Sequence, residues 1–269
     1  MTHIANFRLK EEPFSKEIGD AQLWLPPTRA PLVDDLEAAV RARSSSLVVG
    51  EPGVGKTCVL RALRRRLEHA DFQLTYCHNT TLGRRDFYRQ LCVALGLNPK
   101  ATAASLFHAI SSHVQNLATQ RAHPVFVIDE AHLLHQDTLD HLHILLNYEW
   151  DRRALLSVIL VGLPELAERL GLNRNRALES RLAIRRRVAP LSPEDSFTYL
   201  NFRTAAAGAD RDLFPRDAAT YLHEHSQGVI RSLDRLATAA LVEAAARNRD
   251  RIERDIVNIV ISRETSYRN

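Results

Sequence analysis

The stretch that decides the fold is "GEPGVGKT", residues 50–57, which follows the short apolar run "SSSLVVG" at 44–50 and precedes a segment with helical spacing. It matches GxxxxGK[ST], a pattern whose backbone N–H groups turn inward around phosphate oxygens at the positive end of a helix dipole. Strand, glycine loop and helix in this order predict a P-loop. We expect nucleotide contacts from the whole loop and the helix start, namely Gly50, Glu51, Pro52, Gly53, Val54, Gly55, Lys56, Thr57 and Cys58.

Two residues of the loop and two carboxylates further along the chain supply the predicted chemistry. Lys56 is expected to neutralise the β and γ phosphates, and the Thr57 hydroxyl to coordinate Mg²⁺. The apolar run "PVFVIDE" at 124–130 ends in two carboxylates. Asp129 is expected to hold Mg²⁺, and Glu130 to polarise the attacking water as general base. The pairing of these motifs predicts hydrolysis, with ATP and Mg²⁺ as cofactors.

The order of elements along the chain predicts an α/β fold. Further strands are expected at 72–78, 155–162 and 182–191, with helical patterns between the strands. Such alternation favours a parallel sheet with right-handed crossovers. From Leu191 the pattern becomes helical only. Ser192 is a plausible N-cap before Pro193, and helices are expected at 216–226, 230–247 and 251–264, which together predict a small all-helical subdomain.

Charge and cysteine usage set broad limits. The net charge is +4, from 36 basic and 32 acidic residues, and lysine occurs only at Lys10, Lys16, Lys56 and Lys100. A preference for arginine favours bidentate contacts to phosphate or carboxylate, although genomic base composition produces the same bias. Cys58, Cys77 and Cys92 have neither zinc-knuckle spacing nor an even count. With no apolar run of signal-peptide or membrane-span length, the sequence predicts a cytoplasmic protein without membrane association.

Four stretches besides the P-loop resemble known ATPases: "VFVIDEAHLL" (125–134), "SVILVGLPEL" (157–166), "LESRLAIRRRVAPL" (178–191) and "SQGVIRSLDRLATAAL" (226–241). They look like the AAA+ ATPases of the ExeA/GspA and TniB/TnsC/Mu B groups. The resemblance runs from about Phe7 to Ile261. It implies a P-loop NTPase of the AAA+ ASCE class, with a five-stranded parallel sheet ordered 5-1-4-3-2 and a helical lid. It also implies ATP held between subunits of a ring or helical filament. The expected domains are an N-terminal segment packing on the ATPase core (1–30), the AAA+ domain (31–191) and the lid (192–269).

The same resemblance implies roles for two arginines. "ESRL" places Arg181 where the family has an arginine that projects into the next subunit's site, with Arg176 as the alternative. "GVIRSL" places Arg231 at sensor 2, a lid arginine that reaches the phosphates; the alternative is a solvated arginine at a helix start. On the predicted strand, alternation sends Arg185 and Arg187 to one face and Arg186 to the other, so the three cannot form one patch unless the strand lies at a sheet edge. The remaining arginines of this region are expected to be subunit-interface or solvated residues: Arg174, Arg185, Arg186 and Arg187.

One family position differs here. The residue after the fourth strand is usually polar, whereas this chain has Gly162-Leu163-Pro164. Leu163 cannot orient a water, so either the alignment differs at this point or intrinsic hydrolysis is weak. Asn79, just after the second strand, is a candidate to hydrogen-bond Glu130 and restrain it until a partner binds.

The transposition groups imply an ATP-dependent, largely sequence-nonspecific binder of double-stranded DNA that recruits or activates a transposase or another DNA-recombination protein. In "HNTTLGRRDFYR" (78–89), the expected phosphate contacts are Thr80, Thr81, Arg84 and Arg85, with an ordinary helix start as the alternative. Two other functions stay open. One is an ExeA/GspA-like secretion ATPase, and the other is a nucleotide-dependent loader or switch that acts on a protein partner without DNA.

Overall fold

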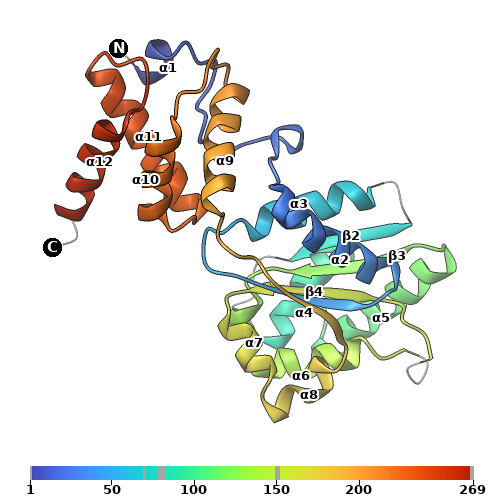
Figure 1. Ribbon diagram of the computed structural model, residues 1–269. Coiled ribbons are helices and arrows are strands. Elements are labelled where there is room, and N and C mark those ends of the chain that lie inside the picture. Colours follow the sequence, from blue (N-terminus) through green and yellow to red (C-terminus); the bar gives the residue numbers. More distant parts are fainter. Residues whose placement is uncertain (1, 69–70, 78–82, 149–151, 267–269) are drawn as a thin grey trace. The chain divides into compact units, whose positions relative to one another are not determined.

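The computed structural model describes residues 2–68, 71–77, 83–148 and 152–266, and these divide into two compact units (Figure 1). The sheet unit comprises residues 29–51 and 59–188. The helical unit comprises residues 1–28, 52–58 and 189–269, within the described ranges. The P-loop segment 52–58 therefore groups with the helical unit.

The sheet unit is built on five parallel strands in the order β2-β3-β4-β1-β5. This is the order predicted from the sequence, counted from the other edge, and the α/β fold class is confirmed. Every residue of β1, β3 and β4 is buried, because these strands have a neighbour on each side and helices lie on both faces of the sheet (Figure 1). The strands are β1 (Ser45–Val49), β2 (Phe72–Cys77), β3 (His123–Ile128), β4 (Ser157–Gly162) and β5 (Leu182–Arg187).

Helices alternate with these strands and supply the apolar side chains of the core. Phe87, Ile110 and Leu139, from three different helices, pack with Phe126 of β3 and Leu160 of β4. The helices that lie wholly or mainly in this unit are α2 (Ala30–Arg41), α3 (Lys56–Leu67), α4 (Arg84–Ala94), α5 (Ala103–Thr119), α6 (Gln136–Leu145), α7 (Glu165–Leu170) and α8 (Arg176–Glu179), with short 3-10 turns at Ala131–Leu133 and Asn173–Asn175. A further 3-10 turn, Pro27–Arg29, has only its last residue in this unit.

Helix α9 (Pro193–Ala206) of the helical unit has an N-cap. The Ser192 hydroxyl accepts a hydrogen bond from the Asp195 N–H at 3.0 Å, and Pro193 occupies the first turn, so the predicted cap is confirmed. Among the described residues, no helix combines the length and apolar character needed to cross a membrane. The helices of this unit are α1 (His3–Asn6), α9 (Pro193–Ala206), α10 (Arg216–Ser226), α11 (Ile230–Ala246) and α12 (Arg254–Ser266), with a 3-10 turn at Asp20–Gln22.

The N-terminal segment contributes aromatic and aliphatic side chains to the core of the helical unit. Phe7, Leu9 and Phe14 are buried there, and the Phe14 ring lies edge-on to Phe214 with centroids 6.0 Å apart. The sequence suggested packing on the ATPase core for this segment. In the structure these three side chains belong to one apolar cluster with residues of α9–α12 and of the segments that join them. The local sequence pattern does not indicate this packing.

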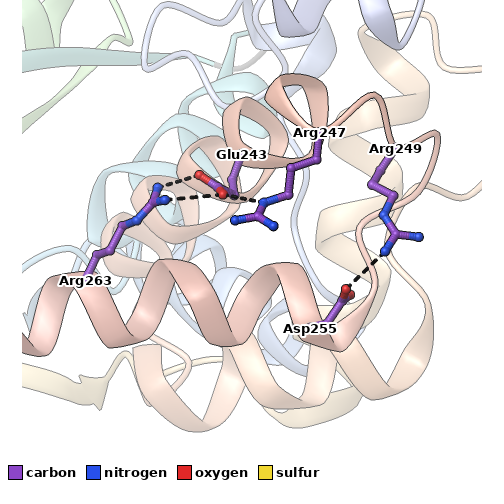
Figure 2. Close-up of polar contacts among 5 residues, drawn as sticks. All are labelled: Glu243, Arg247, Arg249, Asp255 and Arg263. Carbon is purple, nitrogen blue, oxygen red and sulfur yellow. Dashed lines mark hydrogen bonds and ion pairs between the residues drawn. The ribbon is translucent and has the colours of Figure 1, made fainter.

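Polar groups are buried in the helical unit as well. Arg203 donates to the Tyr199 hydroxyl at 2.9 Å and to the Ser15 carbonyl at 2.8 Å, and Tyr199 donates to Asp234 at 2.6 Å. On the facing surfaces of α11 and α12, Glu243 accepts from Arg247 at 2.6 Å and from Arg263 at 2.5 Å (Figure 2). These bonds lower the pKa of Glu243, the bond from Arg247 most.

Candidate nucleotide-binding site

The P-loop is held by the start of α11. The Arg231 N–H donates to the Gly53 carbonyl at 3.2 Å. Gly53 and Gly55 have φ angles of 78° and 97°, a region that glycine adopts without steric cost. A Cβ on Gly53 would lie 2.7 Å from the Arg231 Cβ and 3.3 Å from a Val229 methyl carbon. Glycine is therefore required at position 53 by both backbone angle and space.

The residues after the loop suit a phosphate ligand. Lys56 begins α3 and is only 9% exposed, so its charge is held in a poorly solvated place. Thr57, the next residue, is exposed. Left-handed glycines followed by a helix N-terminus orient backbone N–H groups toward an anion. The loop therefore fits the phosphates that the sequence predicted for residues 50–58.

Asp129 follows β3 and is surrounded by hydrogen-bond donors. One carboxylate oxygen accepts from the Tyr76 hydroxyl at 2.6 Å, and the other accepts from the Glu130 N–H at 2.9 Å. Burial, together with the bond to Asp129, raises the pKa of Tyr76, so its phenol stays protonated and donates at neutral pH. A buried carboxylate with fixed orientation suits a hard cation such as Mg²⁺. Tyr76, on the neighbouring strand β2, was not predicted from the sequence.

Glu130 has a strained backbone. Its φ and ψ angles are 52° and 34°, in the left-handed region, where non-glycine residues are uncommon and cluster at functional sites. Its side chain is 48% exposed, and one carboxylate oxygen lies 3.4 Å from Nδ1 of His132. The chain thus turns sharply after β3 and presents Glu130 to solvent, as a general base requires.

The end of β4 carries no polar side chain of its own, as the sequence indicated. Gly162 is followed by Leu163, whose N–H points to Nδ1 of His132 at 3.4 Å. The imidazole of His132, from the 3-10 turn after Glu130, occupies this place instead. His132 was not singled out from the sequence, although it stands inside the quoted motif "VFVIDEAHLL".

Arginines near β5 fall into two groups. Arg181 directly precedes β5, as predicted, and is partly exposed; Arg176 is exposed on α8. Each arginine of β5 forms an ion pair with a carboxylate of the sheet unit. The pairs are Arg185 with Glu179 at 2.8 Å, Arg186 with Asp35 at 2.7 Å and Arg187 with Glu51 at 3.5 Å. Arg174 similarly faces Asp140 at 3.7 Å. These pairs favour the interpretation of the run as a solvated face, on a strand that lies at the sheet edge.

The residues suggested for DNA contacts are only partly described. Thr80 and Thr81 lie outside the described residues, as does Asn79, which the sequence suggested as a restraint on Glu130. Arg84 begins α4, and its guanidinium lies 2.6 Å from Nε2 of His141, whose pKa is lowered by burial and then by this arginine. Arg85 is exposed. The structure therefore leaves Arg85 available for a phosphate and gives Arg84 a partner within the chain.

Sheet order, P-loop and the carboxylates after β3 together define the fold of a P-loop AAA+ ATPase. Residues 40–170 match the family described as "AAA domain". The chain is 32% identical over 250 residues to General secretion pathway protein A of Aeromonas hydrophila, a match that covers 91% of this chain and 45% of that protein. The chain thus spans less than half the length of this relative.

Solved structures with the same fold include two archaeal proteins and a bacterial motor. The Aeropyrum pernix ORC1 protein in complex with DNA has a TM-score of 0.69 at 17% identity, covering 95% of this chain and 69% of that one. The ORC2 protein of the same organism, with ADPNP and ADP, has a TM-score of 0.68 at 16% identity, covering 94% and 71%. The RuvB Holliday junction branch migration motor of Thermotoga maritima reaches 0.57 at 17% identity, covering 87% and 68%. At these identities the likeness concerns the fold.

Proposed function

We propose that the chain hydrolyses ATP to ADP and phosphate in a Mg²⁺-dependent reaction. The backbone N–H groups of residues 50–58 bind phosphate oxygens, and Lys56 pairs with their charge. The Thr57 hydroxyl and the Asp129 carboxylate hold the metal, which neutralises negative charge on the phosphates when bound. Glu130 accepts a proton from the attacking water at a carboxylate oxygen. Arg231, at the start of α11, contacts the phosphates as sensor 2 does in related ATPases.

We further propose that the ATPase works on duplex DNA in the cytoplasm. It assembles there as a ring or helical filament and recruits or activates a transposase. The observation that carries this proposal is the position of Arg181, partly exposed directly before edge strand β5. A guanidinium there can enter a neighbouring subunit's site and stabilise the charge that develops on the transferred phosphoryl group. DNA acts by aligning subunits, with Arg85 as one phosphate contact.

The test is steady-state ATP hydrolysis with and without duplex DNA at low salt, for the wild type and Arg181→Ala. We expect DNA to stimulate the wild type and not the variant, because an arginine finger contributes on the order of 10³ in kcat. Arg176→Ala, on the neighbouring helix α8, is the matched control and should keep its stimulation. Loss of stimulation in the control alone would move the finger to Arg176. Hydrolysis indifferent to DNA would overturn the DNA-dependent function.

A second candidate is a secretion ATPase, and the similarity to General secretion pathway protein A over 91% of this chain favours it. In that case the ATPase acts on a protein partner. DNA then leaves the hydrolysis rate unchanged, while Glu130→Gln still abolishes turnover. Stimulation by DNA that requires Arg181 would argue against the secretion function.

A further inference from the structure

The imidazole of His132 lies between the ends of two neighbouring strands. Its Nδ1 is 3.4 Å from a Glu130 carboxylate oxygen, after β3, and 3.4 Å from the Leu163 N–H, after β4. The His132 side chain is only 15% exposed. The His132 carbonyl accepts from the Arg169 guanidinium at 3.1 Å, which fixes the turn that carries the ring.

Gly162, at the end of β4, lies against the imidazole of His132. A Cβ on Gly162 would lie 3.2 Å from Nδ1 and 3.2 Å from the backbone nitrogen of His132. Both distances are tighter than ordinary van der Waals contact, and the same Cβ would lie 3.0 Å from a Leu166 methyl carbon. Gly162 therefore leaves room that the imidazole fills.

The same nitrogen faces a donor and an acceptor. With the proton on Nε2, Nδ1 can accept from the Leu163 amide; with the proton on Nδ1, it can donate to the Glu130 carboxylate. One ring nitrogen satisfies one of these neighbours at a time. A donor beside one carboxylate oxygen orients the other oxygen, and a general base depends on such orientation to meet its water.

We propose that His132 is the positioning residue for Glu130, donating from Nδ1 and substituting for the polar side chain that Leu163 does not provide. The inference rests on the proposed ATP hydrolysis and is independent of DNA. It gives the half-exposed carboxylate of a residue with a strained backbone a donor that can orient it. It also assigns Gly162 the role of making room for the ring.

The first test compares His132→Ala, His132→Asn and His132→Gln by ATP turnover, by affinity for a fluorescent ATP analogue and by thermal unfolding. We expect His132→Ala to lower kcat about 10–100-fold, with analogue affinity and unfolding temperature little changed. The Asn amide reaches the position of Nδ1 and should restore most of the rate, whereas the longer Gln reaches that of Nε2 and should not. His135→Ala, a nearby exposed histidine, is the control and should match the wild type.

A second test approaches the ring from β4. Gly162→Ala should displace the imidazole and lower kcat without further loss when combined with His132→Ala. Leu163→Gln should recover turnover in the His132→Ala background. An unchanged or increased rate in His132→Ala, while the wild type hydrolyses ATP, would overturn the inference and leave the proposed function intact. A wild type without hydrolysis, with or without DNA, would instead overturn the proposed function.

Discussion

The two units use charged side chains differently. In the sheet unit, the carboxylates with expected chemistry, Asp129 and Glu130, lie where β3 ends, beyond an apolar core. In the helical unit, Arg203 and Glu243 are buried between segments and bonded to other side chains. The difference teaches that charge where the central strands end is placed for the expected reaction, whereas charge buried between the helices fixes the packing. Substitutions of these two kinds of charged residue should therefore separate activity from stability.

Glu130→Gln should have the largest effect, and on activity alone. An amide of the same shape cannot accept the proton of the attacking water, so kcat should fall about 10³-fold. The side chain is 48% exposed, so the unfolding free energy should change by less than about 0.5 kcal/mol. Steady-state hydrolysis and thermal unfolding check both parts, beside Glu165→Gln on α7 as control. A variant that keeps half of the wild-type rate would remove Glu130 from the reaction.

Arg203→Ala should show the opposite behaviour. Its guanidinium donates to Tyr199 and Ser15 and lies 6.0 Å from the centre of the Phe14 ring. Leaving these partners unsatisfied should cost about 3 kcal/mol. Calorimetry should then show a fall in Tm of roughly 6–12 °C. Arg211→Ala, an exposed arginine of the same unit, should shift Tm by less than about 2 °C. Equal shifts would mean that the buried network does not stabilise the unit.

Asp234 should make stability depend on pH. Burial raises its pKa to about 6, although the hydrogen bond from Tyr199 opposes this. Since the unfolded pKa is about 3.9, the folded chain binds more protons between about pH 4 and 6, and stability falls as pH rises through that window. The loss should be roughly 2–3 kcal/mol. Urea unfolding across these pH values should show it in the wild type; a similar decline in Asp234→Asn would assign it to other groups.

Arg186→Ala should have the smallest effect. Arg186 and Asp35 form an ion pair at 2.7 Å with side chains 42% and 41% exposed. Solvent screens such pairs, so removal should cost about 0.5 kcal/mol or less and leave turnover unchanged. Chemical unfolding at low and high salt measures the contribution. A marked loss of DNA-stimulated turnover would instead place the β5 arginines at a functional interface.

Much of the fold could be predicted because its determinants are local. The glycine loop, the fully buried strands and the Ser192 cap each depend on neighbouring residues. The strand order came from the resemblance, and the structure confirms it. The contacts of Phe7, Leu9 and Phe14 could not be predicted, because an apolar side chain does not specify which distant helices it will meet.

Within the candidate site, the residues predicted from the sequence lie in recognisable motifs. The residues missed are those whose side chains contact a residue beyond the neighbouring strand in the sequence. Tyr76 reaches Asp129 from β2, and His132 reaches Leu163, 31 positions further along the chain. Parallel strands bring these groups together at one edge of the sheet, and the pairing depends on register rather than on local pattern. The fifth strand was also predicted to be too long, to residue 191, whereas β5 ends at Arg187.

The left-handed backbone of Glu130 carries one more consequence. A non-glycine residue in this conformation costs of order 1 kcal/mol or more, and asparagine or glycine would relieve it. Sequence optimisation for thermostability would therefore favour replacing the residue that we expect to be indispensable for turnover. Residue 130 is thus a point where robustness and activity conflict, and stabilised versions of this chain should be sought at other positions.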